Sequence, residues 1–189
     1  IEELYQAEQR VAPTQYSLTV HAAHSLYRLM AYKDEYEVAR LLSDPAFMKS
    51  LTAQFEPGLT LNFHLAPPIG KRLGSDGRPQ KRRFGPWAVR FMSVLARAKV
   101  VRGTPFDIFG YQAERKMERA LRDEFIAQLK HIATHLNKDN YEYYLQLVRL
   151  PQEIRGFGPV KEAAVARYRE RVQAVQAQYK KELQDVKNI

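Results

Sequence analysis

The residues best suited to chemistry lie in one stretch, GKRLGSDGRPQKRRFGPW, which runs from Gly70 to Trp87. The wider segment 71–102 contains ten basic residues and a single acid, Asp76, so its net charge of +9 equals that of the whole chain. Positive charge gathered in one segment indicates a specific anionic partner rather than general solubility. The alternative is a solvated loop followed by the polar face of a helix, and composition leaves both readings open.

Six side chains are the candidate contacts for this anion: His64, Arg72, Lys81, Arg82, Arg83 and Arg102. The guanidinium group of Arg can hold a phosphate or a carboxylate through two parallel hydrogen bonds, which the ammonium group of Lys cannot do. His64 precedes the basic loop and is either a buried, hydrogen-bonded residue or a hydrogen-bonding or proton-transfer group beside the arginines. Because Phe84 and Trp87 are near in sequence, a nucleic-acid-binding module with base stacking is the alternative to a cofactor phosphate or an acidic protein.

The sequence contains no recognisable catalytic or metal-binding signature. His131 and His135 have helical spacing, but Ile132 stands where the metalloprotease motif requires Glu, so we expect a structural role for them and for the pair His21 and His24. The glycines form neither a Walker motif nor a dinucleotide-binding motif, and there is no G-x-S-x-G elbow. There are no cysteines, which excludes disulfides and thiolate metal sites within this chain. We therefore expect no catalytic residue and no metal site.

The elements that must position these residues are mostly helices, because apolar residues recur at helical spacing. We expect helices over residues 13–42, 45–55, 86–101, 113–136, 141–150 and from Pro159 onward. The helix over 86–101 is expected to bury Trp87, Phe91, Val94 and Leu95. The last helix carries the spacing of a helix-pair seam, through Val165, Tyr168, Val172, Val175 and Tyr179.

The fold class predicted from these elements is mostly α: a helical bundle with a long basic Gly/Pro loop and at most one short extended segment, over residues 59–65. We expect residues 1–189 to form a single helical domain. Because the chain begins at Ile1 without an initiator Met, we also expect it to be a fragment of a longer subunit. No apolar run approaches the ~20 residues that cross a bilayer, so we expect a soluble, cytoplasmic protein.

Four stretches occur in a characteristic order: LYRLMAYKDEYEVARLL (26–42), LNFHLAPP (61–68), KRRFGPW leading to RGTPFDIFGYQAERKMER (81–119), and LPQEIRGFGPVK (150–161). Together they resemble the C-terminal helical domain of bacterial indolepyruvate ferredoxin oxidoreductases, members of the 2-oxoacid:ferredoxin oxidoreductase family. The family pattern reads R-G-F-G-H-V-K where this chain has Pro159 in place of the His. A proline at the first position of a helix is a sufficient structural reason for that difference.

The resemblance implies a full enzyme that decarboxylates arylpyruvates oxidatively on thiamine pyrophosphate and magnesium, forms acyl-coenzyme A, and passes electrons through iron–sulfur clusters to ferredoxin. This chain has no G-D-G motif for thiamine pyrophosphate and no cysteine for a cluster. The resemblance therefore implies an accessory part that binds none of these cofactors itself. Its implied partners are another domain or subunit of the oxidoreductase and, through the basic segment, ferredoxin or coenzyme A.

Overall fold

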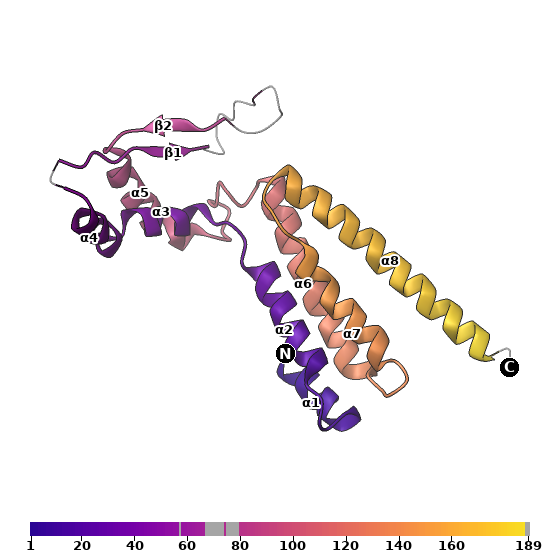
Figure 1. Ribbon diagram of the computed structural model, residues 1–189. Helices are drawn as coiled ribbons and strands as arrows, with labels where there is room; N and C mark the ends of the chain where they lie inside the picture. The colour runs from indigo at the N-terminus through magenta and orange to yellow at the C-terminus, as the bar shows by residue number, and fades with distance from the viewer. Residues whose placement is uncertain (57, 67–73, 75–79, 188–189) are drawn as a thin grey trace. The chain divides into compact units, whose positions relative to one another are not determined.

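The computed structural model describes residues 1–56, 58–66, 74 and 80–187, and it confirms the mostly α-helical fold predicted from the sequence (Figure 1). We predict a single helical domain from the sequence, whereas the chain divides into two compact units. Unit 1 combines residues 1–32 with residues 116–189, and unit 2 is formed by the intervening residues 33–115. Arg72, one of the predicted anion contacts, lies outside the described residues.

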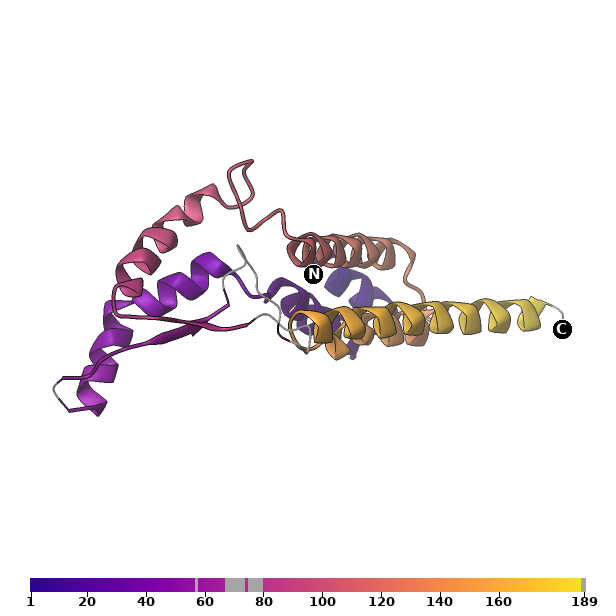
Figure 2. The ribbon, with the colours of Figure 1, turned by 90° about the horizontal axis from the view of Figure 1, so that it is seen from above.

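Unit 1 is a bundle of helices around one apolar core. Its elements are α1 (Glu2–Val11), α2 (Ser17–Met30), most of α6 (Ala113–His135), α7 (Tyr141–Arg149), the 3₁₀ turn η2 (Leu150–Glu153) and α8 (Pro159–Lys187). The apolar stripe predicted for α6 faces the core, where Phe125 and Ile132 are almost completely buried. The predicted seam of α8 packs there too, and Tyr179 stacks on Tyr143 of α7 with ring centroids 3.9 Å apart. Both views show α8 as one long uninterrupted helix (Figures 1 and 2).

A buried carboxylate replaces the missing side-chain cap of α2. Tyr16 at the N-cap position makes no capping hydrogen bond, and Glu8 of α1 instead accepts from the backbone N–H groups of Leu18 and Thr19 at 2.9 and 2.8 Å. The hydroxyl of Tyr141 also donates to Glu8, at 2.7 Å. Burial, followed by this hydrogen bond to a carboxylate, raises the pKa of Tyr141 to about 12. One side chain of α1 thus connects the starts of α2 and α7.

Unit 2 packs helices against a short hairpin. Its elements are α3 (Glu35–Ser43), α4 (Pro45–Gln54), β1 (Phe63–Leu65), β2 (Arg82–Phe84), α5 (Ala88–Arg97) and the 3₁₀ turn η1 (Ala98–Val101). The strand β1 is the predicted extended segment, and β2, formed by the end of the basic stretch, pairs with it in antiparallel fashion. α3 lies against α5, and because Ala39 and Ala88 are both buried, small side chains allow the two helices to approach closely. None of the helices in the described part of the chain is long and apolar enough to cross a membrane.

The helix predicted over residues 13–42 is wrong in its continuity, because the chain forms two helices with a break at residues 31–34. Asp34 has an extended backbone and its carboxylate accepts from the N–H groups of Tyr36 and Glu37, at 2.8 and 3.2 Å. A short acidic side chain that caps a new helix competes with continuation of the preceding one. The break coincides with the boundary between the two units, which falls after Tyr32.

The inward face predicted for the helix over residues 86–101 is wrong for three of its four residues, whereas Leu95 is partly buried and packs against the core of unit 2. Trp87 and Phe91 are each 61% exposed and Val94 is 65% exposed, whereas Ala88 and Met92 are buried. Two stripes with helical spacing lie side by side on α5, and the smaller side chains take the inward position because α3 packs closely there. The larger apolar side chains are left at the surface of unit 2.

Candidate functional site

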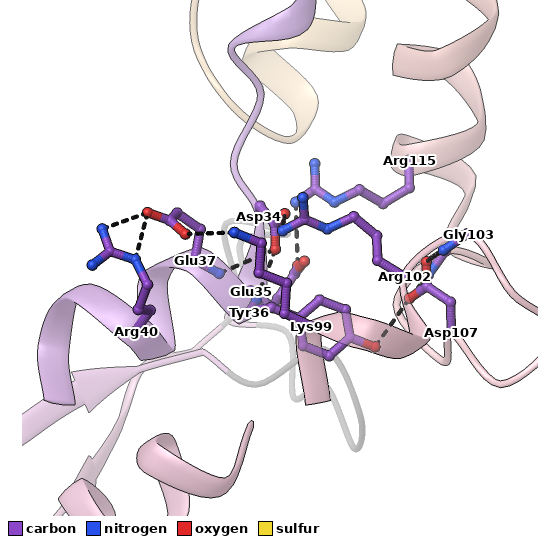
Figure 3. Close-up of polar contacts among 11 residues, drawn as sticks. Asp34, Glu35, Tyr36, Glu37, Arg40, Lys99, Arg102, Gly103, Asp107 and Arg115 are labelled. Atoms are coloured by element: carbon purple, nitrogen blue, oxygen red, sulfur yellow. Dashed lines mark hydrogen bonds and ion pairs between the residues drawn. The ribbon is translucent and has the colours of Figure 1, made fainter. Parts of the chain in front are cut away.

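A network of ion pairs and hydrogen bonds surrounds the start of α3 in unit 2 (Figure 3). Asp34, the cap of α3, also forms an ion pair with Arg102, which follows η1. The next residue, Glu35, pairs with Arg115 at 3.2 Å, and Glu37 lies 3.9 Å from the ammonium group of Lys99. The first turn of α3 is therefore linked to segments 62 to 80 residues further along the chain.

The loop around Asp107 is hydrogen-bonded to α3. Tyr36 donates its hydroxyl to the buried carboxylate of Asp107 at 3.1 Å, and Asp107 also accepts from the N–H groups of Gly103 and Gly110 (Figure 3). Gly103 has a φ of +75°, and a side chain at Gly110 would meet the Asp107 carboxylate, so both positions require glycine. Burial, followed by the hydrogen bond to Asp107, raises the pKa of Tyr36 to about 12. The ring of Tyr36 also meets Phe109 edge-on, with centroids 5.1 Å apart.

This network gives Arg102, one of the predicted anion contacts, an internal partner. Its guanidinium group forms an ion pair with Asp34, a carboxylate of the same unit, and therefore is not an unpaired cation. The physical reason is the packing of α5 and η1 along α3, which places the residue after η1 beside the start of α3. The sequence marks Asp34 only as a helix N-cap, because Glu37 follows it three residues later at the spacing of a capping box. Nothing in the sequence pairs Asp34 with Arg102.

The hairpin separates the remaining predicted contacts onto two faces. Successive side chains of a strand point to opposite faces, and the register places His64 opposite Arg83 and Leu65 opposite Arg82. Arg82 therefore shares the inner face with Leu65, whereas Arg83 shares the outer face with His64. Lys81 directly precedes β2 and is exposed, but it lies outside the paired residues. The structure thus brings His64 and Arg83 together on the outer face and places Arg82 on the inner face. These two residues, His64 and Arg83, and the exposed Lys81 are called the outer cationic face.

The side chain of His64 is exposed, which contradicts the reading of that residue as buried. Within the described residues, no carboxylate forms an ion pair with Lys81, Arg82 or Arg83. Within this described part of the chain, these side chains are therefore available to an external anion.

An apolar pocket of about 400 Å³ lies on the inner side of the hairpin, enclosed by α3, α5 and the loop at residues 108–109. Four of its lining side chains are aromatic: Phe84, Trp87, Phe91 and Phe109. The charged residues in its lining are Lys33, Glu35 and Arg82. Its volume lies within the range of small-molecule sites in proteins. Sequence reasoning missed this pocket, because the side chains that it takes from α5 were expected to fill a core.

The histidines of unit 1 do not meet to form a larger cluster. His131 and His135 stack with ring centroids 4.1 Å apart, and the Nδ1 atom of His135 lies 2.9 Å from the carbonyl oxygen of His131. His21 lies 3.1 Å from the amide nitrogen of Gln152 in η2. In the portion of the chain that the structure describes, no three His, Asp or Glu side chains are arranged to hold a metal ion.

The fold and the site define a mostly α-helical protein whose unit 2 carries an apolar pocket next to a cationic hairpin. The chain belongs to the DUF6537 family, which is described as a family of unknown function and matches residues 1–174. The match includes all of unit 2 and the whole core of unit 1 except the distal part of α8. No curated protein and no solved structure shows significant similarity to this chain.

Proposed function

We propose that this chain is an accessory part, not catalytic on its own, of a cytoplasmic indolepyruvate or other 2-oxoacid ferredoxin oxidoreductase. The four ordered motifs of the sequence support this assignment, and two of them supply the hairpin of unit 2. In the proposed role, unit 2 binds an acidic electron-transfer protein such as ferredoxin. Thiamine pyrophosphate, magnesium and iron–sulfur clusters belong to the rest of the enzyme in this proposal.

The observation that carries the proposal is the outer cationic face, formed by His64, Lys81 and Arg83. All three side chains are exposed at or next to the hairpin. Cofactor phosphates are usually held by buried donors, whereas an open cationic surface suits the docking of an acidic protein and speeds its encounter. The geometry therefore favours ferredoxin over coenzyme A among the anions considered for the basic segment.

The test uses the complete oxidoreductase, with the concentration of the 2-oxoacid substrate held constant and ferredoxin as the electron acceptor. The double variant Lys81→Glu and Arg83→Glu should lower kcat/KM for ferredoxin about tenfold or more at low ionic strength, because steering of an acidic partner is lost. The dependence of the rate on salt concentration should also become flatter. Turnover with a small neutral electron acceptor should stay at the wild-type level, since this surface is not part of the chemistry.

The matched control is Lys180→Glu with Lys181→Glu, which makes the same charge change at exposed positions of α8. That variant should retain the wild-type kcat/KM for ferredoxin. If both double variants lose activity equally, the effect is one of net charge, and the hairpin has no special role. If neither loses activity, the outer cationic face is ordinary surface and the proposed docking is wrong.

A further inference from the structure

We propose that the pocket of unit 2 binds a small amphipathic acid, with an apolar body inside the pocket and a carboxylate held at its mouth by Arg82 and Lys33. This inference is independent of the proposed function, because it rests on the inner face of the hairpin and not on the outer cationic face. It concerns a pocket contained entirely within unit 2.

The walls of the pocket set the nature of the ligand body. Leu42 and Leu65 line it from α3 and β1, and Met92 lines it from α5. The aromatic side chains are held by their neighbours: Phe84 meets Trp87 edge-on at 5.9 Å, and Phe109 meets the buried Tyr36 in the same way. A cavity with apolar walls and aromatic faces favours a flat or branched hydrocarbon group and disfavours a sugar or a nucleotide.

The charges at the pocket set the nature of the head group. Glu35 is the acid of the lining, and its carboxylate is paired with the buried guanidinium group of Arg115. Among the described residues no carboxylate pairs with either cation of the lining, Lys33 or Arg82, and both side chains are exposed. An apolar cavity whose lining includes two exposed cations is complementary to a monoanion with an apolar tail.

The chain contains its own optical reporter for this test. Trp87 is the only tryptophan of the sequence, it lines the pocket, and it is 61% exposed. A ligand that covers its ring should shift its emission to shorter wavelength. The probe is 4-phenylbutanoate, which absorbs little light at the red edge of tryptophan absorption, and the comparison ligand is its neutral amide, 4-phenylbutanamide. We expect a saturable shift with the acid and about tenfold weaker binding of the amide, because the amide lacks the charge.

The neighbouring arginines provide a matched pair of variants. Arg82→Gln should weaken binding of the acid about tenfold and leave binding of the amide unchanged. Arg83→Gln removes the same charge one residue away, on the opposite face of the hairpin, and should change neither affinity by more than about twofold. Circular dichroism and the melting temperature of each variant establish that the fold is retained.

A second pair of variants tests the apolar part of the proposal. Phe91→Ser removes a pocket wall and should weaken both the acid and the amide, whereas Phe106→Ser at a position outside the lining should weaken neither. The proposal is overturned if the acid produces no saturable shift, if acid and amide bind equally well to the wild-type chain, or if Arg83→Gln has the same effect as Arg82→Gln. None of these outcomes bears on the ferredoxin test, which changes Lys81 and Arg83 and leaves Arg82 in place.

Discussion

Arg82 and Arg83 are adjacent in the sequence but take different parts in the molecule. One lies on the inner face of the hairpin beside an apolar pocket, and the other lies on the outer face opposite His64. Arg102 differs again, because its charge is compensated by the carboxylate of Asp34. Residue type alone therefore does not define an anion-binding surface. The direction of each side chain and the presence of an internal partner decide which cations an external ligand can reach.

His21 provides a prediction on pH dependence. Burial, together with the positive charges of Arg149 and His24, lowers the pKa of His21 below its ordinary value of 6.5. Protonation therefore favours the unfolded chain, so the contribution of this residue to stability is complete above about pH 6.5 and is lost as the pH falls. His21→Gln should reduce the drop in melting temperature between about pH 7.5 and about pH 5.5. The two melting curves should differ by a constant amount above pH 6.5, and an unchanged drop would contradict the assignment.

At the scale of elements, the start of α3 is the feature that organises unit 2. The helix begins at a capping residue that is also half of an ion pair, and its first turn carries two further polar contacts to the loop and helix that follow η1. A cap and an ion pair contribute by different mechanisms. The cap satisfies backbone donors that have no partner in the helix, whereas an ion pair near the surface is weakened by solvent.

Substitution of Asp34 separates these two contributions. Asp34→Ala removes both and should lower the free energy of unfolding of unit 2 by about 1 to 2 kcal/mol. Asp34→Asn keeps an oxygen that can accept from the N–H groups of Tyr36 and Glu37, and should cost less than about 1 kcal/mol. Urea unfolding followed by Trp87 emission measures both values, with Lys49→Ala at an exposed position of α4 as the control. Equal losses for Ala and Asn would mean that the capping hydrogen bonds contribute nothing.

At the scale of the whole molecule, each unit has its own buried core. The core of unit 1 includes a buried ion pair: the ammonium group of Lys161 in α8 lies 2.5 Å from Glu118 in α6, and the two residues are only 8% and 2% exposed. Removal of one charge from such a pair is costly, because the other charge remains buried. Because the cores are separate, we expect a substitution in one unit to leave the other unit's stability unchanged.

Lys161→Met should lower the free energy of unfolding of unit 1 by roughly 3 kcal/mol, because the carboxylate of Glu118 loses a buried countercharge. The unfolding of unit 2, followed by Trp87 emission, should stay unchanged, while the transition followed by far-ultraviolet circular dichroism should move to lower temperature. Lys130→Met, at an exposed position of α6, is the control and should change neither transition. A common shift of both signals would show that the two units unfold as one.

The sequence predicted α6, α7 and α8 of unit 1 well, and α6 and α8 have single, regular apolar stripes, whereas α1 was not predicted and α2 was merged with α3. The stripe of α6 and the seam of α8 each leave only one way to face a core. α5 was harder, because the stripe of Trp87 and Phe91 and the stripe of Ala88 and Met92 have the same spacing, and only the close packing with α3 decides between them. The second strand of the hairpin was missed because its run of basic residues resembles a solvated loop.

The candidate site was predicted in part. The exposed cations at Lys81 and Arg83 follow from composition, whereas the division of the hairpin into two faces depends on the strand register, which no local pattern specifies. The partnership of Arg102 with Asp34 joins residues 68 positions apart and requires the tertiary fold. The pocket likewise combines side chains from α3, α5, both strands and the loop at residues 108–109, so no single stretch of sequence predicts it.

The ion pair between Glu35 and Arg115 has a consequence for modularity. These residues lie near the two ends of unit 2, and their side chains meet at 3.2 Å. The chain therefore enters and leaves unit 2 at neighbouring points. A cassette with neighbouring ends can be inserted into a host loop, or exchanged between hosts, without stretching the flanking chain. Unit 2 therefore has the geometry of a transplantable module, which could be grafted whole or replaced by a short linker.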